Sequence, residues 1–223
     1  MAQKWGLTAV PLRPPNAGPV RKGDFERKNL NVISRVPTSD RVVFLTIDDA
    51  SVKDPDFASM VRDLSIPFTT FLSDASRDNY GYFRELLALG HHPVENHTVN
   101  HPDLTRLGPS EQQQEICQQQ IRLTAEIGVF PRLFRPPFGR YDARTLSAAR
   151  ACGVRGIVLW SVEAFPDRIV YGGTLSKLRP GDIVLTHCWG PGQWHGTMVD
   201  MLRRVLQAAA DQHLAVAALE DYV

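Results

Sequence analysis

Short apolar runs alternate with helical patterns along the chain from about residue 41 onward. Between the first two runs, Phe57, Met60, Val61 and Leu64 recur at i, i+3, i+4 and i+7, the spacing of one buried helix face. The apolar runs themselves predict strands. These strands are expected at Val42–Ile47, Pro67–Leu72, Pro93–Glu95, Leu133–Phe134, Val154–Trp160, Ile183–Thr186 and Leu214–Leu219.

Capping residues mark where the later helices begin. Ser110, followed three residues on by Gln113, is typical of a capping box and predicts a helix that extends to Gly128. Asp142 and Thr197 are expected to cap the two helices that follow. The glutamine-rich face of the first of these helices, at 112–120, is expected to face solvent.

Strands that alternate with helices imply βα units and a parallel sheet. About seven such units in about 180 residues predict an α/β fold built as a small closed or nearly closed βα barrel. An open doubly wound sheet is the alternative. One domain accounts for residues 41–223, and residues 1–40 form an N-terminal arm packed on the domain or leading into it.

Charge distinguishes the arm from the domain. The whole chain has a net charge of +1, but residues 1–41 carry eight Lys and Arg against three Asp and Glu. This basic, proline-containing segment can touch an anionic surface or lie solvated on the domain. The remaining composition is ordinary for a soluble domain, so no nucleic-acid partner is predicted.

Cysteine usage and the chain start give little guidance on compartment. Cys117, Cys152 and Cys188 are an odd number without CxxC spacing, so neither a disulfide framework nor a cysteine-based zinc site is expected. No apolar run approaches the ~20 residues that span a bilayer. The first residues lack the apolar stretch of a signal peptide, which leaves a cytosolic protein or a mature exported domain as alternatives.

Polar residues fall where the expected strands end. Asp48 and Asp49 follow the first strand, Arg135 follows the fourth, and Trp160 and His187 end the fifth and sixth. In a βα barrel these carboxyl ends form one face, so side chains far apart in sequence converge there. The pattern therefore predicts an active site on this face.

His97 and His101 follow the third strand and are four residues apart. On a helical turn this spacing puts both imidazoles on one side, where they can share a metal ion. HxxxH alone is a weak signal, because two exposed or capping histidines have the same spacing. The carboxylates of Asp48 and Asp49 offer a third ligand and a second acid.

The two acids need different roles because adjacent residues at a strand end point in different directions. One can bind the metal while the other accepts a proton from the attacking water, and a nearby cation such as Arg135 would keep that base ionised. His187 supplies the general acid that the departing amine of an amide requires.

Four ordered motifs carry a family resemblance: Thr46-Ile47-Asp48-Asp49, His97-Thr98-Val99-Asn100-His101, Arg135-Pro136-Pro137-Phe138-Gly139 and Leu185-Thr186-His187. They resemble the motifs of the polysaccharide deacetylase family, also called the NodB-homology or carbohydrate esterase 4 family. The resemblance covers roughly residues 41–221 and is highly specific as an ordered set. It implies a distorted (β/α)7 barrel, a metal that is usually Zn²⁺ (with Co²⁺ as another candidate), and N-acetylglucosamine chains of the chitin or peptidoglycan type as substrates.

Matched motif by motif, the resemblance implies catalytic roles. Asp48 becomes the base, and Asp49, His97 and His101 become the metal ligands. Arg135 is expected to hold and tune Asp48.

The resemblance also implies the substrate side of the site. His187 becomes the general acid, the backbone N–H of Phe138 stabilises the oxyanion, and Leu185 lines the pocket for the acetyl methyl group. Trp160, at the end of its strand, is expected to contact substrate as well. The family's own residue at Phe138 is usually Tyr, a change that leaves a backbone donor untouched.

The fourth family motif, D-x-x-D-W, is poorly matched here. Glu163 or Asp167 is expected to do the work of its acid, while its terminal Trp is missing. In the loop beyond His187, Trp189 and Trp194 can stack on sugar rings or pack within the loop.

We therefore expect a zinc-dependent N-deacetylase that acts on a carbohydrate as a monomer, and the family resemblance implies an extracellular or cell-envelope location. O-deacetylation of another polysaccharide, or hydrolysis of a non-sugar amide, would use the same site. A glycan-binding homologue with a dead site is a further alternative. The intact Asp48–Asp49 pair, HxxxH motif and His187 argue against it, because binding alone needs neither base nor acid.

Overall fold

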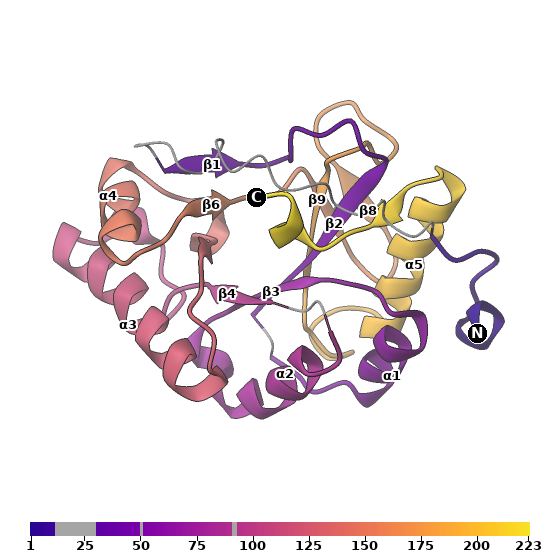
Figure 1. Cartoon of the computed structure of the whole chain (residues 1–223), viewed down its shortest axis with the longest axis horizontal. Helices are drawn as coiled ribbons and strands as arrows, with labels where there is room; N and C mark the ends of the chain where they lie inside the picture. Colours follow the sequence, from indigo (N-terminus) through magenta and orange to yellow (C-terminus); the bar gives the residue numbers. More distant parts are fainter. Residues whose placement is uncertain (12–29, 50, 91–92) are drawn as a thin grey trace.

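The structure is a computed structural model that describes residues 1–11, 30–49, 51–90 and 93–223. Within these residues, one curved sheet forms the centre of the molecule and helices surround it (Figure 1). Its strands are β1 (Asn31–Ile33), β2 (Val42–Asp48), β3 (Thr69–Leu72), β4 (Val94–Asn96), β5 (Leu133–Phe134), β6 (Gly156–Val158), β7 (Val162–Ala164), β8 (Ile169–Tyr171), β9 (Ile183–His187) and β10 (Ala215–Val216).

The order of the strands identifies the architecture. The sheet runs β1-β6-β5-β4-β3-β2-β9-β7-β8, and β10 adds to β2. Strands β2 to β6 follow one another without the reversal that defines a doubly wound sheet. Pairing is parallel everywhere except between β7 and β8. The expected distorted barrel is confirmed, and it remains open between its edge strands β1 and β8 in the described part of the chain.

The helices begin largely where their capping residues indicate. Asp142 and Thr197 each accept a hydrogen bond from a first-turn backbone N–H, as expected. The capping box at Ser110 is wrong, because Gly108 is the N-cap and donates its N–H to Glu111. The helices are α1 (Pro55–Leu64), α2 (Tyr80–Leu87), α3 (Pro109–Ile127), α4 (Ala143–Ala151), α5 (Met198–Asp211) and the 3₁₀ turns η1 (Ala2–Trp5), η2 (Asp74–Asn79), η3 (Leu104–Arg106), η4 (Pro137–Gly139) and η5 (Leu219–Asp221).

Strand β2 is buried along its whole length because it separates two apolar layers. Val43 and Leu45 pack outward against the helices, whereas Phe44 packs inward with Phe71 and Ile183. Side chains alternate along a strand, so Asp48 at its end lies on the same inner side as Phe44. The strand thereby delivers one carboxylate to the mouth of the barrel interior.

Only some of the α3 glutamines face solvent, so the expected solvent face is only partly right. Gln112, Gln119 and Gln120 are buried. Gln120 accepts a hydrogen bond from the Asn96 amide at 2.8 Å, and Gln119 donates to the backbone carbonyl of Leu72 at 2.8 Å. These buried amides are therefore hydrogen-bonded to strands β3 and β4, as buried polar groups usually are.

The expectation of no disulfide is also corrected. Cys117 of α3 and Cys152, just after α4, form a disulfide between residues 35 apart in sequence. The pairing follows from the packing of α3 against α4, which the spacing of the cysteines does not reveal. Cys188 is a free, buried thiol.

Part of the expected N-terminal arm belongs to the sheet. Strand β1 pairs with β6, and Val36 is buried in the inner cluster. At the chain start, Trp5 donates its indole N–H to Asp63, and Arg203 donates to the Trp5 carbonyl. Residues 12–29 of the arm lie outside the described residues. No helix among the described residues is long and apolar enough to cross a membrane.

Candidate metal and catalytic site

Strands β2 and β9 bring two predicted catalytic residues together. They are adjacent parallel strands, and Asp48 is the register partner of His187. Asp48 is buried and His187 is mostly buried, with 17% of its side chain exposed. The convergence of strand ends expected from the sequence is therefore present for this pair.

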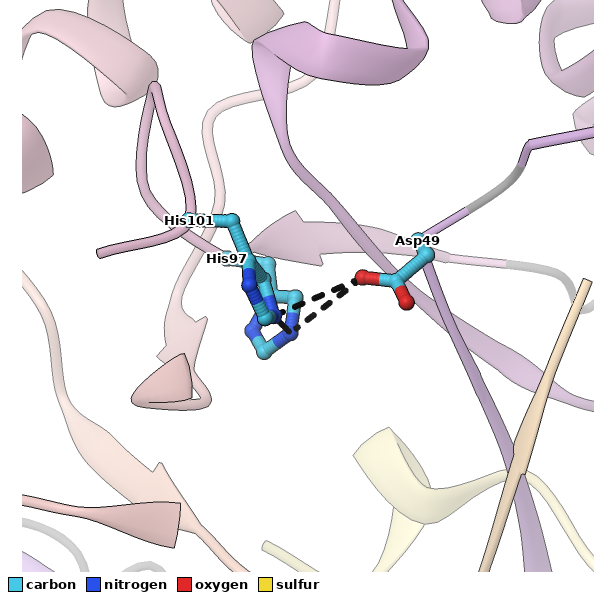
Figure 2. Close-up of side chains that lie close together, drawn as sticks. All are labelled: Asp49, His97 and His101. Carbon is cyan, nitrogen blue, oxygen red and sulfur yellow. Dashed lines mark hydrogen bonds and ion pairs between the residues drawn. The ribbon is translucent and has the colours of Figure 1, made fainter. Parts of the chain in front are cut away.

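Asp49, His97 and His101 point toward one another at the same mouth (Figure 2). The two imidazole Nε2 atoms lie 3.1 Å apart. One carboxylate oxygen of Asp49 lies 3.5 Å from Nε2 of His101 and 3.8 Å from Nε2 of His97. These three residues are the predicted ligand set.

The donor triangle fits a tetrahedral metal ion. Zn²⁺ bonds of about 2.0–2.1 Å place neighbouring ligand atoms about 3.4 Å apart, close to the three observed distances. The Nδ1 atom of His97 lies 2.6 Å from the carbonyl oxygen of Arg135, to which it donates when protonated. That bond leaves the lone pair on Nε2 facing the triangle. Burial lowers the pKa of His97, which also favours the neutral, ligating form.

The ligand residues are not on a helical turn, so the expected reason for their convergence is wrong. Residues 97–101 form a loop after β4, and Thr98 and His101 both have positive φ, 70° and 55°. Asp49 and Phe138 also have positive φ. These four are among only six such non-glycine residues in the described part of the chain. Backbone strain of this kind concentrates at functional sites.

Two side chains that the sequence did not single out hold this loop. Asn96 accepts the Thr98 N–H through its side-chain oxygen at 2.8 Å. Glu115 of α3 accepts the backbone N–H groups of Val99 and Asn100, at 3.1 and 2.8 Å, through one carboxylate oxygen. A helix residue 15 positions beyond the loop carries no sequence signal for this role.

Arg135 and Asp48 form a buried ion pair, as expected for a base held by a cation. The guanidinium donates to a carboxylate oxygen of Asp48 at 2.7 Å and is itself fully buried. It also donates to the carbonyl oxygens of Val158 and Leu159 and lies over the ring of Phe71. Burial raises the pKa of Asp48, and the ion pair with Arg135 offsets part of that rise. The second Asp48 oxygen lies 3.6 Å from Nε2 of His97.

The structure distinguishes the two candidates for the fourth motif acid. A carboxylate oxygen of Glu163, on β7, lies 4.0 Å from Nδ1 of His187. Asp167 is exposed and pairs with its neighbour Arg168. Glu163 is therefore the acid that faces His187.

The predicted substrate residues divide into exposed and buried groups. Phe138 is 59% exposed, and its ring lies edge-on to His101 with ring centroids 4.8 Å apart. Leu185 is buried two residues before His187, hence on the same side of β9. Trp160 lies against Gly139 so closely that a Cβ there would come within 3.0 Å of its ring.

The two loop tryptophans also differ. Trp189 is partly buried and stacks on His187. Trp194 is 7% exposed and packs edge-on to Trp189, so within-loop packing, one of its two expected roles, describes it. Cys188 turns its sulfur toward the Val52 carbonyl and away from the donor triangle.

A model of the polysaccharide deacetylase family matches residues 35–157, over half of the chain. The chain belongs to the polysaccharide deacetylase family. The match spans the two aspartates, both histidines and Arg135, but ends before Glu163 and His187. The resemblance read from the ordered motifs is confirmed.

Similar proteins include two that are named deacetylases. An uncharacterized protein of Streptomyces coelicolor is 37% identical over 221 residues, which cover 97% of this chain and 88% of that protein. A chitooligosaccharide deacetylase of Bradyrhizobium sp. is 35% identical over 158 residues, 66% of this chain and 70% of that protein. A solved peptidoglycan N-acetylglucosamine deacetylase aligns with a TM-score of 0.74, covering 87% of this chain and 94% of that one. At 22% identity this last likeness shows the fold.

Proposed function

We propose that the protein is a metal-dependent hydrolase that removes N-acetyl groups from N-acetylglucosamine-containing glycans of the chitooligosaccharide or peptidoglycan type. The observation that carries this proposal is the donor triangle of Asp49, His97 and His101 beside the ion-paired Asp48. Both lie at the mouth of a deacetylase-family barrel. Zn²⁺ is the proposed metal, because two imidazoles and one carboxylate form a catalytic zinc ligand set.

Asp48 is the proposed base. When bound, the metal supplies a Lewis acid that polarises the amide carbonyl and makes the attacking water more acidic. Asp48 has one oxygen committed to Arg135 and the other directed toward the ligand set, so this second oxygen is placed to take the water's proton. Arg135, without a proton to release at neutral pH, keeps the carboxylate in position and charged.

His187 is the proposed acid, and Glu163 its partner. Cleavage of the C–N bond leaves an electron pair on nitrogen, which needs a proton to depart as an amine. His187 lies on the strand next to Asp48, so base and acid face the same space. A carboxylate oxygen of Glu163 lies 4.0 Å from Nδ1 of this imidazole. The backbone N–H of Phe138 remains the proposed oxyanion donor, and Leu185 the proposed wall for the acetyl methyl group.

The substrate class rests on the relatives. The names of the Bradyrhizobium protein and of the aligned structure specify N-acetylglucosamine chains. The exposed Phe138 ring beside His101 offers such a chain an aromatic surface. We propose that the protein acts as a monomer on glycans outside the cell membrane.

O-acetyl ester hydrolysis is the rival activity, since the same ligand set and base would serve it. The presence of His187 beside an acid favours amide hydrolysis over ester hydrolysis. An amine leaves only when it is protonated, whereas an alkoxide is a better leaving group. An inactive glycan-binding homologue would have no use for the buried Asp48–Arg135 pair, which costs desolvation energy to keep.

Replacing Asp48 with Asn tests the proposal. We expect Asp48→Asn to retain zinc while kcat for acetate release from chitooligosaccharides falls by on the order of 10²–10⁴-fold, the usual scale for a lost general base. Asp49→Asn should instead lose bound zinc together with activity. Asp167→Asn is the matched carboxylate-to-amide control and should keep both, because Asp167 is exposed, pairs with Arg168 and is not part of the donor triangle.

Zinc content and melting temperature are measured for each variant. These measurements would reveal a folding defect in Asp48→Asn, which leaves Arg135 without its ion-pair partner. If folded Asp48→Asn turned over substrate as fast as the wild-type protein, Asp48 would not be the general base. No acetate release by the zinc-loaded wild-type protein from chitin-type or peptidoglycan-type oligomers would refute the function itself.

A further inference from the structure

His187 is stacked against a tryptophan. The imidazole and the Trp189 ring have centroids 4.3 Å apart and an interplanar angle of 23°. Trp189 is in turn supported by the edge of Trp194, at 5.9 Å and 65°, and Trp194 is buried. One face of the imidazole is therefore covered by a ring that itself packs against a buried tryptophan.

The backbone that carries Trp189 is fixed on both sides. Cys188 donates its N–H to the Asp48 carbonyl at 3.1 Å and accepts the Ser51 N–H at 3.0 Å. On the other side, Gly190 accepts the N–H groups of Gln193 and Trp194. The indole is thus held at a defined position relative to the end of β2.

Hydrogen bonds do not fix the His187 ring in the described structure. Its Nδ1 atom is buried without a hydrogen-bond partner, and the nearest acid, Glu163, is 4.0 Å away, beyond hydrogen-bonding distance. A side chain without a directional bond is held by packing, and the stacked indole is the flat surface that restricts rotation of this imidazole about χ2.

We propose that Trp189 is a positioning residue for His187, and that it acts in deacetylation by holding the imidazole edge toward the substrate nitrogen. The inference rests on the proposed function. This role differs from a sugar-stacking platform, because the ring face that contacts His187 is not available to a ligand.

The test compares Trp189→Leu, which keeps an apolar side chain, with Trp189→Phe, which keeps a ring that can stack. For acetate release from an N-acetylglucosamine oligomer, Trp189→Leu should lower kcat on the order of 10-fold with KM unchanged, as expected for a misplaced catalytic group. Trp189→Phe should recover most of that loss. Trp5→Leu is the matched control, since Trp5 packs near the chain start against Asp63 and should not affect either constant.

Two further measurements separate positioning from structural damage. Hydrolysis of an activated acetate ester, which needs no protonated leaving group, should change little in Trp189→Leu, as in His187→Ala. In the zinc-free protein, the His187 ring proton resonances should be shifted by the indole ring current in wild type and Trp189→Phe, and lose most of that shift in Trp189→Leu. Zinc content and melting temperature report on folding.

A rise in KM at constant kcat would make Trp189 a sugar platform and overturn the inference. Unchanged kinetics in Trp189→Leu, or equal losses in the Leu and Phe variants, would overturn it as well. Failure of the proposed function is distinguishable, because the wild-type protein would then release no acetate while the ring-current shift of His187 would still be present.

Discussion

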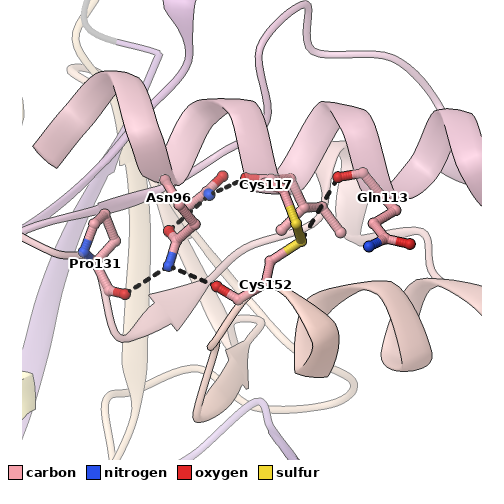
Figure 3. Close-up of a disulfide and its surroundings, with 7 residues drawn as sticks. Asn96, Gln113, Cys117, Pro131 and Cys152 are labelled. Carbon is pink, nitrogen blue, oxygen red and sulfur yellow. Dashed lines mark hydrogen bonds between the residues drawn. A yellow bond between two sulfur atoms is a disulfide. The ribbon is translucent and has the colours of Figure 1, made fainter. Parts of the chain in front are cut away.

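The disulfide between Cys117 and Cys152 gives a quantitative prediction for stability. It ties the middle of α3 to the end of α4, with Cα atoms 4.9 Å apart (Figure 3). The two helices also pack through buried side chains that include Ile116 and Ala149. Reduction should therefore leave the native packing in place and act mainly on the unfolded chain.

The size of the effect follows from the length of chain that the bond closes. For a sequence separation of 35, the chain-entropy relation gives about 3.8 kcal/mol at 25 °C. With an unfolding entropy of about 2.1 cal/mol/K per residue over 223 residues, this corresponds to a melting temperature about 8 °C lower after reduction.

The assay compares oxidised and reduced protein by thermal and urea unfolding. A Cys117→Ala/Cys152→Ala variant is the control, because it should melt near the reduced wild type and be insensitive to reductant. The number of thiols that can be alkylated in denaturant shows whether the starting protein is oxidised or reduced. One thiol, that of Cys188, should react before reduction and three after it.

Two outcomes would contradict this reasoning. Three reactive thiols in protein purified under oxidising conditions would mean that the bond does not form. A single reactive thiol with no difference in melting temperature would mean that the cross-link does not restrict the unfolded chain as calculated. The expected result would also favour an oxidising compartment, where such bonds persist.

Two further predictions concern acidic residues. Glu115→Ala should weaken zinc binding to the zinc-free protein by on the order of 10–100-fold, measured by titration, because the ligand loop loses the carboxylate that accepts two of its backbone N–H groups. Exposed Gln118→Ala on the same helix is the control. Burial raises the pKa of Glu220 from 4.5 to about 7, so the stability it contributes is full below pH 4.5 and lost as pH rises through 7. Glu220→Gln should remove that loss, worth about 3 kcal/mol in urea unfolding at pH 8 relative to pH 4.5. It should also lessen any loss from Glu95, because burial and then the charge of Glu220 raise the pKa of Glu95. An unchanged difference between the two pH values would exclude Glu220 as its source.

The parts of the fold that could be predicted most accurately from the sequence are the elements buried along their whole length. Strand β2 was recognisable because both of its sides are apolar, which also placed Asp48 and Asp49 at its end. Asp142 and Thr197 were recognisable because capping is local chemistry. The short strands β1, β7 and β8 were not predicted. Each is three residues long and is stabilised by pairing with a neighbour rather than by its own pattern.

Residues that act through distant partners escaped prediction for a different reason. The role of Gln120 depends on Asn96 of β4, and the disulfide depends on how α3 packs against α4. Neither relation has a fixed sequence spacing. The stacking of Trp189 on His187 was likewise missed, because neighbouring residues in a loop carry no periodicity from which ring contacts can be deduced.

The ligand loop shows why the HxxxH spacing alone is weak evidence. A helix would bring His97 and His101 together through its own hydrogen bonds, but this loop does so through left-handed residues at Thr98 and His101. Such conformations cost on the order of 1–3 kcal/mol each, so they persist only where the surroundings hold them. Here the surroundings are the Asn96 side chain within the strand and Glu115 on α3. The metal site is therefore specified jointly by the motif and by a helix outside it, and substitution of Glu115 should weaken metal affinity although Glu115 is not a ligand.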